Sequence, residues 1–173
     1  TVLVGGDYQG GNPDVSNANV TYFGPDATLK ADARQNGDGG KVIVWADDTT
    51  RAYGNISVKG GAEGGDGGFV EVSGRRSLDF RAAVDTRAAQ GKTGMLLLDP
   101  DSITVGGTDS GGLWSGGVFD SNGSDATLDS ATLVSQLGIS NVTLQTGASG
   151  SGDINFNTTT VTSGSSNSLT LLA

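Results

Sequence analysis

The side chains that could do chemistry in this sequence are carboxylates, arginines and lysines, because the chain contains no histidine and no cysteine. Histidine is the commonest general base, and histidine and cysteine supply most zinc sites and catalytic triads. Carboxylates beside an arginine or lysine can still cleave polysaccharides or bind calcium. The residues that could form such a group are Asp79, Asp85, Asp99, Asp101, Arg81 and Arg87. Because they are scattered over turns and solvent faces, we predict no enzyme and no catalytic, metal or cofactor site.

The charge of the chain limits its partners. The 173 residues carry a formal net charge of −9, and every basic residue lies between Lys30 and Lys92. Nucleic acids and anionic membranes attract basic surfaces, so neither is an expected partner. No run approaches the roughly 20 apolar residues of a membrane-spanning helix, and we therefore predict no membrane insertion.

The elements that must position these side chains are short strands in a repeat of about 27 residues, a period typical of stacked repeat proteins. A Gly-Asp-Gly-Gly turn and the strand after it, residues 37–44, recur at 65–72 and more weakly at 92–98. A second strand falls in each interval, at residues 27–31, 55–59 and 83–87. Each repeat is therefore predicted to be strand, turn, strand and glycine-rich turn.

Apolar residues alternate along these strands, which places one face of each strand in a core. A repeat this short cannot bury its apolar face alone, whereas stacked repeats form a continuous interior column. The pattern therefore predicts an all-β parallel β-helix, or solenoid. An antiparallel sandwich also has strands with alternating apolar residues, but it would not require the same turn at the same phase of each repeat. We therefore rank it second. The predicted column consists of Val42, Val44, Ile56, Val58, Val70, Val72, Val84, Leu96 and Leu98.

The chain is predicted to form one continuous domain with three parts. Residues 1–106 carry the repeats, residues 107–128 form a Gly/Ser-rich excursion, and residues 129–173 contain a short helix near 130–137 followed by further strands. Asp129 is the expected N-cap of this helix and Gly138 its C-terminal residue. The further strands are expected at residues 142–144, 154–156 and 169–171. The first and last residues have the sequence pattern of strand interiors, so we expect this chain to be a fragment of a longer polypeptide.

Four residues are candidates for ligand contact. Trp45 and Phe69 lie opposite the inward valines, and sugar rings stack on exposed aromatic faces. Arg75 and Arg76 belong to the one cationic concentration in the chain, which could contact an anionic polysaccharide.

The same outer face carries Ile43, Met95 and Leu97, and a monomer usually covers so large an apolar patch. We expect the segment after Gly106 to pack over it, through Trp114 and Phe119.

Four motifs, taken in order, resemble a known family. They are GKVIVWAD at residues 40–47, GNIS at 54–57, GGFVEVSG at 67–74 and LLLDP at 96–100. In this order they resemble filamentous-haemagglutinin-like exoproteins and high-molecular-weight adhesins. The resemblance covers residues 1–106, and the remainder looks like the family's continuation.

The resemblance implies a right-handed parallel β-helix that is exported by two-partner secretion and used in adhesion, aggregation or biofilm. It also implies a secreted, cell-surface location, an outer-membrane transporter for the parent chain, and host or matrix glycans or surface proteins as partners. This chain would be a shaft segment. The alternatives are a polysaccharide-processing β-helix enzyme and a module that captures haem or a haem protein, although the missing histidine argues against direct haem ligation.

Overall fold

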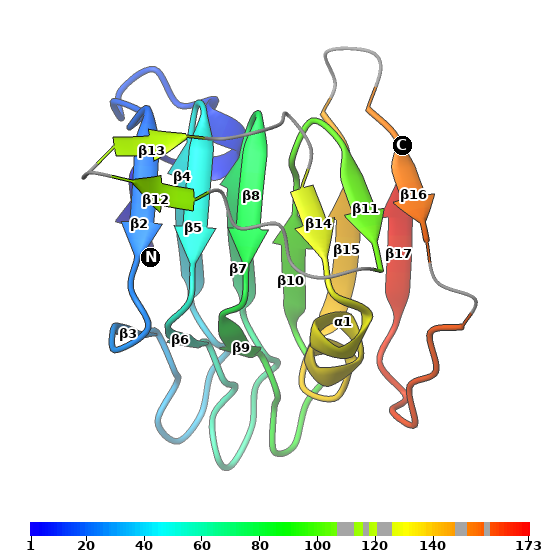
Figure 1. The fold of residues 1–173 in the computed structure, drawn as a ribbon. Helices are drawn as coiled ribbons and strands as arrows, with labels where there is room; N and C mark the ends of the chain where they lie inside the picture. Colours follow the sequence, from blue (N-terminus) through cyan, green and yellow to red (C-terminus); the bar gives the residue numbers. More distant parts are fainter. Residues whose placement is uncertain (107–112, 116–117, 121–125, 148–151, 158–159) are drawn as a thin grey trace.

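The computed structural model describes residues 1–106, 113–115, 118–120, 126–147, 152–157 and 160–173. Most of these residues lie in or between short β-strands, the main sheets are parallel, and the described part of the chain contains one α-helix. The predicted all-β class with a short helix is therefore confirmed. Figure 1 shows the strands in facing layers, with the helix at the lower end.

The largest sheet is parallel and contains six strands. They are, in spatial order, β1 (Val2–Val4), β4 (Lys41–Ala46), β7 (Phe69–Gly74), β10 (Met95–Leu98), β15 (Asn141–Gln145) and β17 (Leu169–Leu172). The register places similar side chains next to one another, since Val42 pairs with Val70 and Val70 with Leu96. Paired residues in a parallel ladder point to the same side of the sheet, so these side chains form one apolar column.

Two three-stranded parallel sheets complete the N-terminal repeats. One contains β2 (Val20–Phe23), β5 (Thr49–Ala52) and β8 (Ser77–Phe80), and the other contains β3 (Thr28–Lys30), β6 (Asn55–Ser57) and β9 (Ala83–Asp85). In both sheets each strand pairs with the third strand further along the chain. The chain therefore returns to the same sheet once per repeat.

Each repeat contains three strands, so the prediction of two strands per repeat is wrong. The missed strands in these repeats are β2, β5 and β8. In β5, the polar residues Thr49, Thr50 and Arg51 replace the expected apolar alternation, yet all three are buried. The Thr50 hydroxyl donates a hydrogen bond to the backbone carbonyl of Ser73 at 2.7 Å, which compensates its burial.

The C-terminal part adds a further parallel sheet in the order β14-β11-β16. Its strands are β11 (Ile103–Val105), β14 (Ala126–Leu128) and β16 (Ile154–Phe156). β14 lies beside β8, so this sheet extends the layer of β2, β5 and β8 (Figure 1). Two short strands, β12 (Leu113–Ser115) and β13 (Val118–Asp120), pair with each other in antiparallel fashion. The strands predicted at 142–144, 154–156 and 169–171 are confirmed as β15, β16 and β17.

The core lies between these sheets. Every residue predicted for the interior column is buried there, which confirms the inward face of each predicted strand. The core also contains the two aromatic side chains Phe23 and Phe80, together with Leu133 and Leu137 from the helix.

The Gly-Asp-Gly-Gly turns are fixed by contacts between repeats. The carboxylate of Asp38 accepts a hydrogen bond from the backbone N–H of Asp66, and Asp66 accepts one from Lys92 N–H, both at 2.8 Å. Each aspartate therefore binds the backbone of the next repeat and not that of its own turn. A Cβ at Gly39 would lie 1.9 Å from the carbonyl oxygen of Val58, so that position admits only glycine.

The helix α1 (Ser130–Leu137) occupies the predicted range and closes the edge of the sheet that ends in β9. Asp129 occupies the N-cap position, but its side chain makes no capping hydrogen bond. Gln136 is buried, and its Oε1 accepts from Val84 N–H at 3.1 Å while its Nε2 donates to the Ala82 carbonyl at 3.3 Å. This side chain thus replaces the backbone of a further strand. Among the described residues, no helix has the length and hydropathy needed to cross a membrane.

We predict that Gln136→Leu lowers the free energy of unfolding by about 3 kcal/mol, because it leaves a buried backbone N–H and a buried C=O without partners. Urea unfolding followed by circular dichroism measures this loss. Gln90→Leu makes the same exchange at an exposed position and should leave the unfolding midpoint close to that of the wild type. Equal midpoints for Gln136→Leu and the wild type would contradict the edge-closing role of the helix.

Candidate ligand-binding cleft

The outer face of the six-stranded sheet carries rows of side chains that point away from the core. One row contains Ile43, Glu71, Leu97 and Thr143, which pair in register across β4, β7, β10 and β15. All four are buried, including the Glu71 carboxyl group, whose exposed fraction is 0%. Other parts of the chain must therefore cover this face.

Part of the cover comes from the N-terminal strap, which we define as residues 5–19, including the 3-10 turn η1 (Tyr8–Gly10). A Cβ added at Gly10 would lie 2.7 Å from the Trp45 ring, so the strap backbone packs directly on the indole. Gln9 adopts a left-handed conformation with φ 51°, and its backbone N–H lies 3.2 Å from both carboxylate oxygens of Glu71. The strap thus lies over β4 and β7.

We predicted that the segment after Gly106 covers this face. The strap, from the opposite end of the sequence, covers Trp45 and Glu71, whereas Met95 of the predicted patch stays 42% exposed. The side chains of Trp114 and Phe119 lie outside the described residues, so their part of the prediction is untested.

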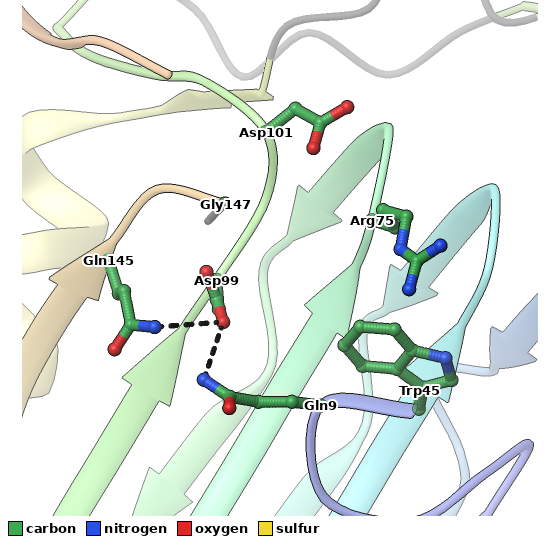
Figure 2. Close-up of a pocket in the computed structure, with 7 residues that line it drawn as sticks. All are labelled: Gln9, Trp45, Arg75, Asp99, Asp101, Gln145 and Gly147. Carbon is green, nitrogen blue, oxygen red and sulfur yellow. Dashed lines mark hydrogen bonds between the residues drawn. The ribbon is translucent and has the colours of Figure 1, made fainter. Parts of the chain in front are cut away.

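A cleft of about 360 Å³ lies where the strap meets the carboxyl ends of the sheet strands. Its lining residues, shown in Figure 2, are Gln9, Trp45, Arg75, Asp99, Asp101, Gln145 and Gly147. Trp45 is in β4, Arg75 follows β7, Asp99 follows β10 and Gln145 ends β15. Because parallel strands end at the same edge of a sheet, residues far apart in the sequence meet here.

Asp99 is held in place by two amides. Its Oδ2 accepts a hydrogen bond from Gln9 Nε2 at 3.1 Å and one from Gln145 Nε2 at 3.3 Å, as Figure 2 shows. The side chain is almost fully buried, with 7% of the residue exposed. Its second oxygen, Oδ1, is buried and has no hydrogen-bond partner in the described part of the chain. The two hydrogen bonds therefore hold the Asp99 carboxyl group through one of its oxygens.

Burial changes the acidity of two carboxyl groups at this site. Removal from water raises the pKa of Glu71 to about 7, and the hydrogen bond from Gln9 only partly offsets this effect. Burial also raises the pKa of Asp99 above its usual range, and the nearby charge of Asp101 adds to the shift. Negative charge is therefore costly on this part of the outer face.

The structure brings together two of the four predicted ligand-contact residues. Arg75 is exposed and lines the cleft. Trp45 also lines it, but only 3% of this residue is exposed, and its Nε1 donates to Asp47 at 3.1 Å. Trp45 thus lies on the predicted face of its strand but offers no open ring face for a sugar, because the strap covers the indole.

The other two candidates lie outside the cleft. The Phe69 ring packs edge-on against Tyr8 of the strap, with ring centroids 5.9 Å apart. Arg76 is exposed and forms an ion pair with Asp48 at 3.2 Å. Neither residue is among those that line the cleft.

The carboxylates considered for catalysis do not form one group. Asp79 pairs with Arg81 at 3.1 Å, and Asp85 pairs with Arg87 at 2.7 Å and Lys59 at 3.0 Å. Burial alone would raise the pKa of Asp85, but hydrogen bonds from Arg87 and Lys59 outweigh it and lower that pKa to about 2. Only Asp99 and Asp101 line the cleft. Within the described ranges, no three His, Cys, Asp or Glu side chains gather as potential metal ligands.

Three residues of this region were missed by sequence reasoning. Gln9 and Gln145 have no motif that marks them, since the repeat pattern says nothing of the strap or of polar residues at strand ends. Glu71 had a signal, because it alternates with the inward Val70 and Val72 and shares its outward face with apolar Ile43. A charged residue in such a row indicates a buried functional or structural contact.

No protein-family model matches the chain, and no curated protein matches it.

We predict that the protein becomes less stable as the pH rises from 4.5 towards 7. Glu71 has a higher pKa in the folded protein than in the unfolded chain, whose ordinary value is 4.5, so the folded state binds the proton more tightly. Its stabilising effect is complete below the unfolded pKa and is lost as the pH passes through the folded pKa. The change is at most about 3 kcal/mol over this interval. Urea unfolding at several pH values measures it.

Glu71→Gln isolates this effect, because glutamine keeps an acceptor for the Gln9 N–H but does not titrate. This variant should show a flatter pH dependence and exceed the wild type in stability above pH 7. Glu63→Gln removes the same charge at an exposed site and should retain the wild-type pH dependence. If Glu71→Gln and the wild type lose stability in parallel, another group is responsible.

Proposed function

We propose that this chain is a right-handed parallel β-helix and a structural, adhesive segment of a secreted bacterial surface exoprotein of the filamentous-haemagglutinin type. Its role is to present an extended outer surface for adhesion, aggregation or biofilm formation, and it is not an enzyme. The stacked rungs would form part of the shaft of a longer chain that a dedicated outer-membrane barrel exports.

The observation that carries the proposal is the register of the six-stranded sheet. Val2, Val42, Val70, Leu96, Val142 and Leu169 follow one another across β1, β4, β7, β10, β15 and β17. A core that continues from strand to strand in one direction is typical of a solenoid. Parallel connections within a sheet are almost always right-handed, which supports the proposed hand.

The positions of the acidic side chains favour a binding surface over an enzyme. Asp79 and Asp85 form ion pairs with Arg81 and Arg87 at separate places, so they do not join Asp99 and Asp101 in the cleft. Repeat proteins of this kind use extended faces for binding. The four ordered motifs that resemble filamentous-haemagglutinin-like proteins support the surface location.

Deletion of one complete repeat tests the solenoid. Removal of residues 41–68 takes out β4, β5 and β6 together and joins Gly40 to Phe69, so β7, β8 and β9 can pair with β1, β2 and β3 in the same register. We expect a β-rich circular dichroism spectrum and cooperative thermal unfolding, at a lower Tm because the strap loses Trp45. A solenoid tolerates this loss because each repeat contacts only its neighbours.

Deletion of half a repeat is the matched control. Removal of residues 41–54 takes out β4 and β5 but leaves β6, which breaks the order of the three sheets. This variant should not fold cooperatively. If the complete-repeat deletion fails in the same way as the half-repeat deletion, the solenoid proposal is wrong.

The adhesive role is tested with beads coated with the purified chain. We expect the coated beads to attach to epithelial cell layers or to clump with one another. The control beads carry Val70→Asp at the same density, a variant expected to unfold because an unpaired charge replaces a core side chain. If wild-type beads attach and clump no more than these control beads, the chain is not adhesive by itself.

A further inference from the structure

We propose that the cleft between the N-terminal strap and the strand ends binds a neutral sugar through its hydroxyl groups. This inference deepens the proposed adhesive role and rests on it. A volume of about 360 Å³ suits a small ligand of this kind.

The donors and acceptors of the cleft match sugar hydroxyls, each of which donates one hydrogen bond and accepts others. Asp99 and Asp101 supply carboxylate acceptors, and Arg75 supplies donors. Within the described part of the chain, the Arg75 guanidinium forms no ion pair, although Asp101 lies in the same lining. Figure 2 shows the two residues on neighbouring segments, and the Asp101 backbone N–H donates a hydrogen bond to the Arg75 carbonyl at 2.8 Å.

The cleft is organised before any ligand arrives. Gln9 and Gln145 come from elements at opposite ends of the sequence, and both fix Asp99 through Oδ2. Oδ1 of Asp99 is buried without a partner in the described residues, which is uncommon for a carboxylate oxygen.

The charges favour a neutral ligand over an acidic one. Asp99 and Asp101 line the cleft, Glu71 lies beneath the strap, and the chain as a whole carries −9. These acidic groups would repel a carboxylate or sulfate on the ligand, and Arg75 is the cation among the residues that line the cleft. The covered indole of Trp45 forms part of the wall and closes one side against water.

The test is saturation-transfer NMR and calorimetric titration of the full chain with three neutral probes, methyl α-glucoside, methyl α-mannoside and methyl β-galactoside. At least one should bind with millimolar or better affinity. Arg75→Ala should weaken this binding by roughly ten- to a hundredfold, because charge-assisted hydrogen bonds are lost. Arg75 is exposed, so its replacement should leave the fold intact.

Arg76→Ala is the matched control, since Arg76 is the next residue in sequence, is also exposed, and pairs with Asp48 outside the cleft. It should bind the probe as the wild type does. Asp101→Asn gives a second lining variant and should also weaken binding.

The inference is overturned if folded wild type binds none of the three glycosides, or if Arg75→Ala and Arg76→Ala bind equally. It is also overturned if calcium chloride or sodium glucuronate binds at the cleft and the neutral probes do not. Adhesion without glycoside binding would reject the sugar site and leave the adhesive role standing. Glycoside binding by beads that neither attach nor clump would reject the adhesive role.

Discussion

The parallel register of the six-stranded sheet is the constraint on which the rest of the structure depends. Val42, Val70 and Leu96 can share one column only if each repeat returns to the sheet at the same phase. The glycine-rich turns enforce this phase, because a side chain at Gly39 or Gly67 would collide with a backbone carbonyl of the adjoining strand segment. A change in one turn would therefore displace a whole layer of the core and not only a surface loop.

The same register places apolar side chains and a carboxyl group in one row on the outer face. The strap covers this row at a cost in conformational energy. The row that contains Ile43 and Leu97 also contains Glu71, so covering the apolar residues buries a carboxyl group. The Gln9 backbone must adopt positive φ to place its N–H against that carboxyl. Left-handed conformation at a residue other than glycine is uncommon and costs energy, so the contact with Glu71 compensates a local strain.

Sequence reasoning succeeded where side-chain pattern and repeat phase act together, and failed where contacts depend on distant parts of the chain. The alternation in β4 and β7 and the repeated turn before them were enough to identify the core. β5 was missed because its polar residues Thr49, Thr50 and Arg51 are buried by contacts with distant parts of the chain, such as the hydrogen bond from Thr50 to the Ser73 carbonyl, and no local pattern reveals such contacts. Gln136 was missed for a similar reason, since a polar residue on the buried face of a helix gains its partners only when β9 lies beside it.

The cleft lies at a point where the regular repeat of the structure is interrupted. A ladder of stacked strands gives a flat wall, because each layer repeats the shape of the one before it. A hollow requires a departure from the repeat, and two departures meet at Asp99: the strap brings Gln9, and the end of β15 brings Gln145. Polar side chains held from both sides at such a point are fixed more firmly than exposed residues of a regular strand. The first place to seek a small-ligand site on this structure is therefore the point where the repeat is interrupted.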